Sequence, residues 1–219
     1  MKKYLVIGNP IEHSLSPKLH NYWIKENNID AVYNKKQLNE NDIKGTISEV
    51  ADGKIDGINV TVPFKKSVIP FLNELTPLAK EAQSVNTIYK KDGKAVGDNT
   101  DIDGFGHALK HIDYNVQGKK VFILGAGGVV SSIILALKKA GASEIVLSNR
   151  TKEKAENLKK IYSYLKVVDW GDVPDFNMII NATSLGLKEN DEIKLNYADI
   201  GANKLFYDII YNPSETKFL

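Results

Sequence analysis

The amino-acid sequence predicts an α/β protein made of two domains. Short apolar runs with strand-like composition alternate with segments whose apolar residues recur at helical spacing along most of the 219 residues. From residue 102 onwards, this alternation becomes more regular and the helical segments become longer. We therefore expect an N-terminal α/β domain at residues 1–101 and a second domain with a parallel sheet at residues 102–219.

Three strands and four helices are expected in the first domain, followed by a hairpin. The strands are placed at residues 4–7, 31–36 and 58–62, and the helices at residues 16–28, 43–50, 65–75 and 78–85. Ser16 and Pro17 suit the N-cap and the first turn of the first helix. Within residues 86–99, Asp92 and Gly93 are typical of the central residues of a tight hairpin turn.

The second domain is expected to begin with a helix at about residues 103–112. The segment VFILGAGGVVSSIILALKKAG, residues 121–141, then predicts an apolar strand, a glycine-rich turn and an amphipathic helix. Further strands are expected in SEIVLSNRT (143–151), MIINATS (178–184) and KLFYDIIYNP (204–213). The polar residues that end the last two strands either bind ligands, as at the carboxyl ends of open parallel sheets, or only form turns.

Composition and charge exclude several classes of protein. The chain is 42% hydrophobic and 26% charged, as in ordinary globular proteins, and its net charge is +2. No segment concentrates basic residues enough for a nucleic-acid groove. The apolar run after the N-terminal lysines is too short for a signal peptide or a membrane span. The absence of cysteine fits a reducing compartment. From these observations together, we expect a cytoplasmic protein that binds neither nucleic acid nor a membrane.

The glycine turn suits a dinucleotide. Gly125 and Gly127 match the first two glycines of the Rossmann fingerprint, in which main-chain N–H groups approach a pyrophosphate at a helix N-terminus. Val130 occupies the third, normally small, position. A strand-to-helix turn without a ligand has similar glycines, but the strand that follows supports a Rossmann-type, doubly wound domain.

The end of that next strand favours NADP over NAD. NAD-binding domains have an acidic residue there for the ribose 2′-hydroxyl, whereas this chain has Asn149, Arg150 and Thr151. A guanidinium pairs with a 2′-phosphate that an acid would repel. Lys154, one turn into the next helix, either adds a second cation or is an ordinary solvent-exposed lysine.

A nicotinamide cofactor performs hydride transfer itself, so the first domain would have to hold a small alcohol or ketone and move one proton. Four polar segments adjoin its apolar strands: HSLSP with Ser14 and Ser16, NVTVPFKK with Asn59, Thr61 and Lys65, SVNT with Asn86, and GDNTD with Asp98, Asn99 and Asp101. Their hydroxyl and amide groups suit a hydroxyl-rich substrate. Ser16 as a helix cap and Asn86 as a strand end are the simpler alternatives. No metal is expected, because His107 and His111 lack the glutamate of an H-E-x-x-H site.

Eight motifs occur in a fixed order across nearly the whole chain: SLSP, NVTVPFK, SVNTI, GDNTDIDGF, GAGG, NRT, NATSLG and YDIIYNP. In this combination the sequence resembles the shikimate dehydrogenases. The resemblance implies an NADP-dependent oxidoreductase that reversibly reduces 3-dehydroshikimate to shikimate, a step of aromatic amino-acid and chorismate biosynthesis. It also implies a small-molecule substrate and a monomer or homodimer.

The resemblance assigns roles to individual residues. Lys65 and Asp101 become the catalytic pair. The residues expected to bind substrate are Ser14, Ser16, Thr61, Lys65, Asn86, Asp101 and Tyr211, with the two serines on its carboxylate. The residues expected to bind NADP are Gly125, Ala126, Gly127, Gly128 and Val129 at the pyrophosphate, Asn149, Arg150, Thr151 and Lys154 at the 2′-phosphate, and Thr183 and Ile209 at the nicotinamide half.

Family members continue with a glycine-rich loop and helices beyond the position of Leu219, so we expect this segment and its substrate-binding glutamine to be absent. Two alternative functions follow. One is a quinate/shikimate dehydrogenase of broader specificity, although the serine pair and Arg150 favour shikimate and NADP. The other is a catalytically silent protein that binds NADP or shikimate. The presence of both Lys65 and Asp101 argues against it, and the missing segment argues for it.

Overall fold

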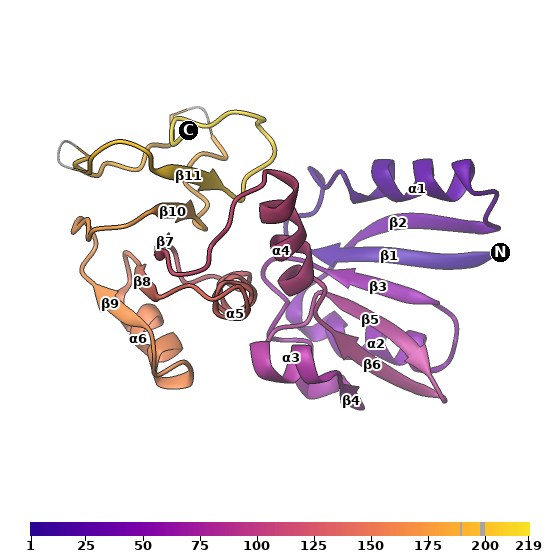
Figure 1. The fold of residues 1–219 in the computed structure, drawn as a ribbon. Helices are drawn as coiled ribbons and strands as arrows, with labels where there is room; N and C mark the ends of the chain where they lie inside the picture. The colour runs from indigo at the N-terminus through magenta and orange to yellow at the C-terminus, as the bar shows by residue number, and fades with distance from the viewer. Residues whose placement is uncertain (189, 198–199) are drawn as a thin grey trace. The chain divides into compact units, whose positions relative to one another are not determined.

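The computed structural model describes residues 1–188, 190–197 and 200–219. The chain divides into two compact units, Met1–Ile102 and Asp103–Leu219, each built on its own sheet (Figure 1). The domain boundary expected from the sequence, after residue 101, lies beside this division. Among the described residues, no helix is long and apolar enough to cross a membrane.

The first unit contains a six-stranded mixed sheet with the strand order β2-β1-β3-β5-β6-β4. Its strands are β1 (Lys2–Gly8), β2 (Ala31–Gln37), β3 (Gly57–Val60), β4 (Glu74–Leu75), β5 (Thr87–Lys91) and β6 (Lys94–Asp98). Strands β1, β2 and β3 are parallel, whereas β5 is antiparallel to β3 and β6. The carboxyl ends of β1, β2, β3 and β6 therefore lie at the same edge of the sheet as the start of β5.

Helices cover both faces of this sheet. They are α1 (Ser16–Glu26), α2 (Ile43–Ala51) and α3 (Pro77–Ala82), with short 3-10 helices at Glu40–Asp42 and Ile69–Phe71. Figure 1 shows α1 on one face and α2 and α3 on the other. Ile43, Ile47 and Val50 of α2 are buried, as their helical spacing predicts, and they pack in one cluster with Ile58 and Ile88. Burial of each such side chain contributes about 1.5–3 kcal/mol.

The hairpin between β5 and β6 is confirmed. Lys91 pairs with Lys94, which leaves Asp92 and Gly93 as the two turn residues. Both have positive φ angles, 50° at Asp92 and 74° at Gly93. A two-residue turn with two left-handed residues matches the twist of the flanking strands, and Asp-Gly is among the sequences that adopt it most readily.

The prediction that Ser16 caps α1 is wrong. The helix includes Ser16 as its first residue, and Leu15 occupies the N-cap position. The Ser14 hydroxyl instead accepts a hydrogen bond from the main-chain N–H of Ser16 at 3.3 Å. Ser14 thus satisfies a donor of the first turn, so capping does not account for the Ser16 hydroxyl. Pro17 lies in the first turn, as expected.

Residues 65–75 do not form the predicted helix. The chain makes turns as far as the 3-10 helix and then enters β4. Pro70 lacks the N–H that a continuous helix would need. Asn73 ties the segment to the sheet, because its N–H donates to Ala95 O at 3.0 Å and its side chain accepts from Ala95 N at 2.8 Å. Pairing with the sheet outweighs the local helical pattern.

The second unit contains a five-stranded parallel sheet with the order β11-β10-β7-β8-β9. Its strands are β7 (Lys120–Leu124), β8 (Glu144–Ser148), β9 (Lys166–Val168), β10 (Met178–Asn181) and β11 (Leu205–Asp208). Strands β8 and β9 are added on one side of β7, and β10 and β11 are then added on its other side. This is the doubly wound Rossmann-type order, and the prediction of it is confirmed.

Helix α4 (Asp101–His111) begins at the end of the first unit and continues into the second, which also contains α5 (Val130–Lys139) and α6 (Lys152–Ile161). The predicted strand, glycine turn and helix at residues 121–141 correspond to β7, the turn and α5. Strand β9 was not expected from the sequence. It is only three residues long, and its pairing with β8 identifies it as a strand.

Candidate active site

The topology of the first sheet gathers the four polar segments at one edge. Ser14 and Ser16 follow β1, Thr61 and Lys65 follow β3, Asn86 precedes β5, and Asp101 follows β6. Hydrogen bonds join these connections, because Val60 N donates to Asn86 O at 2.8 Å and Asn86 N donates to Asp98 O at 3.0 Å. Segments that are distant in the sequence therefore meet here.

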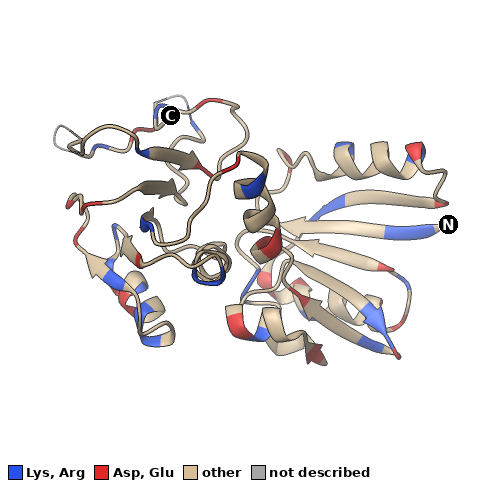
Figure 2. Cartoon of the chain, viewed as in Figure 1, with Lys and Arg blue, Asp and Glu red and all other residues tan. Residues whose placement is uncertain are grey.

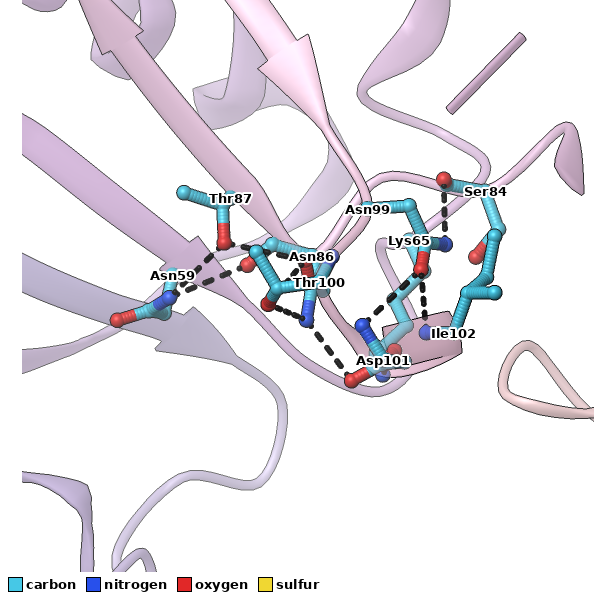
Figure 3. A network of polar contacts seen from close by, with 9 residues as sticks. All are labelled: Asn59, Lys65, Ser84, Asn86, Thr87, Asn99, Thr100, Asp101 and Ile102. Carbon is cyan, nitrogen blue, oxygen red and sulfur yellow. Dashed lines mark hydrogen bonds and ion pairs between the residues drawn. The ribbon is translucent and has the colours of Figure 1, made fainter. Parts of the chain in front are cut away.

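Lys65 and Asp101 form an ion pair at this edge. Lys65 Nζ donates to Asp101 Oδ2 at 2.6 Å, and the two side chains are only 12% and 24% exposed (Figure 3). The Lys65 main chain is also held, because its carbonyl accepts from Val85 N at 2.8 Å. Partial burial strengthens such a pair relative to one in open solvent. The ammonium is thus held in one place in spite of its flexible stem.

Asn86 holds the other oxygen of Asp101. Its Nδ2 donates to Asp101 Oδ1 at 2.8 Å, and its Oδ1 accepts from the main-chain N–H of Thr100 at 2.9 Å (Figure 3). A main-chain N–H can only donate, so this contact fixes which end of the Asn86 amide faces Asp101. Asn86 is therefore more than the end of a strand.

Asn99 caps the helix that carries Asp101. Its Oδ1 accepts from the N–H groups of Asp101 at 3.1 Å and Ile102 at 3.3 Å, and its Nδ2 donates to Ser84 O at 2.9 Å. The Asn99 side chain is buried, at 1% exposure. Its role is to anchor the start of α4, as Asn commonly does at helix N-termini.

The loop after β3 approaches β1 closely. Strand β3 ends at Val60, two residues before the predicted end, and Thr61 N donates to Ile7 O at 2.9 Å. A side chain at Gly8 would lie 2.6 Å from Thr61 Cγ2, so glycine is required for this approach. Pro63 and the turns after it then lead the chain to Lys65, while Lys66 is exposed.

Tyr33 lies beside Ser16. Burial raises the pKa of its hydroxyl, and the neighbouring Ser16 hydroxyl partly offsets this rise. Tyr33 OH donates to Asn59 Oδ1 at 2.6 Å. The sequence interpretation missed Tyr33, Thr87 and Thr100. Thr87 and Thr100 stand inside the polar motifs SVNT and GDNTD, which is a signal, whereas nothing local marks Tyr33.

The glycine turn of the second unit lies at the point where the strand order reverses. Gly125 has a φ of +111°, and a Cβ there would lie 2.6 Å from Ala182 O, at the end of β10. A Cβ on Gly127 would meet nothing within 4 Å. A tight turn, open space above it and a helix beginning at Val130 together fit a pyrophosphate.

The residues expected at the adenosine end follow β8. Arg150, Thr151 and Lys154 are exposed, and Asn149 Nδ2 donates to Thr151 O at 2.8 Å. Lys152 pairs with Asp169 at 2.7 Å, whereas Arg150 and Lys154 form no ion pair within the described residues. Figure 2 shows charges of both signs on α6. The side chains of Arg150 and Lys154 could therefore both bind a phosphate near Thr151.

The residues expected at the nicotinamide half lie on adjacent strand ends. Asn181 Oδ1 accepts from Thr183 N at 3.0 Å and Thr183 Oγ1 at 2.7 Å, and Ile209 N donates to Asn181 O at 3.1 Å. Asn181 Nδ2 also donates to Asp208 Oδ2 at 3.0 Å. Asn181 thereby orders the loops after both β10 and β11. Tyr211, farther along the second loop, is 68% exposed.

A doubly wound unit with a nucleotide-fitting glycine turn, joined to a unit with a lysine–aspartate pair among hydroxyl and amide groups, defines a dinucleotide-dependent dehydrogenase. Comparison with known families makes this specific. Residues 6–88 match the family described as "Shikimate dehydrogenase substrate binding domain", and residues 107–190 match "Shikimate / quinate 5-dehydrogenase". The chain belongs to the shikimate dehydrogenase family.

Individual relatives agree with this assignment. The chain is 59% identical over 218 residues to a protein of Pelagibacter ubique named shikimate dehydrogenase (NADP(+)), covering 100% of this chain and 82% of the relative. The crystal structure of shikimate dehydrogenase from Aquifex aeolicus superposes with a TM-score of 0.90 at 40% identity, covering 100% of this chain and 82% of that one. The enzyme of Thermus thermophilus, solved in complex with NADP(H) and shikimate, superposes with a TM-score of 0.86 at 29% identity, covering 97% of this chain and 80% of that one.

Proposed function

We propose that this protein is an NADP-dependent oxidoreductase that reversibly reduces 3-dehydroshikimate to shikimate, in the pathway to chorismate and the aromatic amino acids. The observation that carries the proposal is the Lys65–Asp101 pair, with 2.6 Å between Nζ and Oδ2, at a sheet edge rich in Ser, Thr and Asn. Membership of the shikimate dehydrogenase family supports the choice of substrate and cofactor.

The pair suits reduction of a ketone. NADPH, when bound, supplies the hydride. Negative charge then develops on the substrate oxygen, and the Lys65 ammonium stabilises that charge and donates a proton. Asp101 keeps Lys65 in place, and its remaining lone pairs accept a hydrogen bond from a substrate hydroxyl. In the reverse direction, Lys65 takes the proton back.

The other polar residues would bind and orient the substrate. Ser14 and Ser16 donate hydroxyl hydrogens to its carboxylate, and Thr61 and Asn86 contact its ring hydroxyls. Tyr211 is a further residue that the family motifs assign to the substrate. These roles follow from the family motifs, and the position of the first four residues at one sheet edge supports them.

The second unit would hold NADP. The residues Gly125, Ala126, Gly127, Gly128 and Val129 surround the pyrophosphate, Asn149, Arg150, Thr151 and Lys154 bind the 2′-phosphate, and Thr183 and Ile209 contact the nicotinamide half. The open space above Gly127 and the exposed guanidinium of Arg150 support these assignments. We also propose a cytoplasmic location, which cell fractionation would test. We further propose that the protein is a monomer or a homodimer, which light scattering would test.

The test is an assay of purified protein with shikimate or quinate and with NADP⁺ or NAD⁺, followed by the absorbance of the reduced nicotinamide. We expect turnover with shikimate and NADP⁺. Equal turnover of quinate would favour the broader enzyme, which the description of the family matched by residues 107–190 also names. No turnover with any combination, together with NADP binding by calorimetry, would favour a silent binding protein.

A further inference from the structure

Asp101 and its neighbours need more support than the ion pair provides. The terminal torsions of Asp and Asn side chains are broad and have no single staggered minimum. A carboxylate or amide of this kind is held in one orientation only by its hydrogen bonds. Lys65 holds one Asp101 oxygen and Asn86 holds the other. Thr100 holds the Asn86 amide from one side, because its N–H donates to Asn86 Oδ1 at 2.9 Å and its Oγ1 accepts from Asn86 Nδ2 at 2.9 Å.

Thr87 and Asn59 connect Asn86 to the centre of the sheet (Figure 3). Thr87 Oγ1 donates to Asn86 Oδ1 at 3.0 Å, and Asn59 Nδ2 donates to Thr87 Oγ1 at 3.3 Å. Asn59 and Thr87 are direct partners in the antiparallel pairing of β3 and β5. The sheet register, fixed by main-chain bonds, places the two side chains together.

The direction of each hydrogen bond follows from main-chain groups. Asn59 Nδ2 faces the main-chain carbonyl of Asn86 at 3.4 Å, and a carbonyl can only accept. Asn59 Oδ1 must then face Tyr33, whose hydroxyl donates to it at 2.6 Å. At the other end, the Thr100 N–H fixes the Asn86 amide. The donors therefore all point one way, from Tyr33 through Asn59, Thr87 and Asn86 to Asp101.

Tyr33 is a rigid origin for this chain of hydrogen bonds. Its side chain is 3% exposed, and its ring stacks on His20 with 4.2 Å between the ring centroids. Asn21 of α1 holds the Tyr33 main chain from both sides, since its Nδ2 donates to Tyr33 O at 2.7 Å and its Oδ1 accepts from Tyr33 N at 3.0 Å.

We propose that Thr87, with Asn59 and Tyr33 behind it, is a positioning residue that holds the Asn86 amide and thereby orients the Asp101 carboxylate toward Lys65. Hydrogen bonds that run in one direction polarise and strengthen one another. The inference rests on the proposed function, in which Asp101 holds the proton donor. It adds Thr87 and Tyr33, to which the family motifs assign no contact with substrate or cofactor.

Two substitutions of Thr87 separate positioning from structural stabilisation. Thr87→Val keeps the shape and the preference for a strand but removes the hydroxyl, whereas Thr87→Ser keeps the hydroxyl. We expect Thr87→Val to lower kcat for shikimate about fivefold, the rate equivalent of one neutral hydrogen bond. Thr87→Ser should restore most of that rate. The thermal midpoint of Thr87→Val should equal or exceed that of Thr87→Ser, and the KM for NADP⁺ should not change.

Tyr33→Phe is a second test at the far end of the chain, and we expect it to lower kcat in the same way. Its control is Tyr114→Phe, which removes a hydroxyl that donates to Asn177 O at 3.3 Å in the second unit. The control should leave kcat unchanged. Wild-type kcat in Thr87→Val, or equal losses in Thr87→Val and Thr87→Ser, would overturn the proposal.

A crystal structure of Thr87→Val without ligands tests the positioning even if the wild type proves inactive, which would refute only the proposed function. We expect the Asn86 amide and the Asp101 carboxylate to leave their wild-type orientation. An unchanged Asp101 in that structure would overturn the inference, while an active wild type would leave the proposed function intact.

Discussion

Lys65 and Asp101 are 36 positions apart in the chain, yet Nζ of the lysine lies 2.6 Å from Oδ2 of the aspartate. Lys65 reaches this point from the end of β3, and Asp101 from the end of β6. The antiparallel strand β5 lies between these two strands and brings both ends to the same edge. The pair is thus a product of the sheet topology.

Replacing Lys65 by alanine should remove most of the turnover and little of the binding. Loss of a positioned proton donor lowers kcat by about 10²- to 10⁴-fold. The affinity for shikimate, measured by calorimetry, should change little. Lys66→Ala is the matched control, because Lys66 is adjacent and exposed. Equal losses of rate and affinity, or an unaffected rate, would contradict the role given to Lys65.

Replacing Asp101 by asparagine should impair both rate and substrate binding. The neutral amide holds the Lys65 ammonium less firmly and accepts more weakly from a substrate hydroxyl. We expect kcat to fall and the KM for shikimate to rise, each by about tenfold. Asp103→Asn, on the exposed side of α4, serves as the control. Kinetics like those of the wild type would remove Asp101 from the catalytic pair.

Replacing Arg150 by alanine should weaken the binding of NADP⁺ and leave the use of NAD⁺ unchanged. The hydrogen bonds between a guanidinium and a phosphate are charge-assisted and strong. Their loss should raise the KM for NADP⁺ about tenfold or more. Activity with NAD⁺, which lacks the 2′-phosphate, should stay the same. Lys152→Ala is the control, because Lys152 already pairs with Asp169. A parallel loss with both cofactors would place Arg150 elsewhere than at the 2′-phosphate.

The two glycines of the turn should respond differently to alanine. Gly125→Ala adds a Cβ 2.6 Å from Ala182 O at a positive φ, so the free energy of unfolding should fall by about 1–3 kcal/mol or more. Gly127→Ala has open space and should leave the unfolding midpoint near that of the wild type. It should nevertheless weaken the binding of NADP⁺, because the added methyl group occupies the space through which the pyrophosphate approaches the main chain. Chemical denaturation and calorimetry measure the two effects, and equal destabilisation by both substitutions would contradict this account.

His20 should make the fold more sensitive to acid. Burial lowers the pKa of His20 below its usual value, so the unfolded chain binds a proton at a pH where the folded chain does not. Stability should therefore decline as the pH falls below about 6.5. His20→Phe keeps a ring against Tyr33 and removes the titration. Denaturation experiments at neutral and mildly acidic pH compare the wild type with His20→Phe. If the two lose the same free energy of unfolding, His20 does not contribute to the acid sensitivity.

Local sequence signals were reliable where one short segment decides its own structure. Asp92 and Gly93 form the expected turn, because both adopt left-handed angles at little cost. Ile43, Ile47 and Val50 form the buried face of α2. The segment around Pro70 was wrongly expected to be helical, because Asn73 finds partners in β6 that no local pattern reveals.

The sequence by itself determined the two-domain α/β organisation, the Rossmann-type order of the second sheet, and the family with its candidate residues, because the motifs and periodicities that carry them are local. The tertiary structure decided which of these residues meet. It paired Lys65 with Asp101 and placed Thr87 opposite Asn59. It also showed that the Ser14 hydroxyl, and not that of Ser16, accepts a hydrogen bond from the first turn of α1. Such contacts depend on sheet register and strand order, which arise from hydrogen bonds between distant segments, and for this reason no single stretch of the chain contains them.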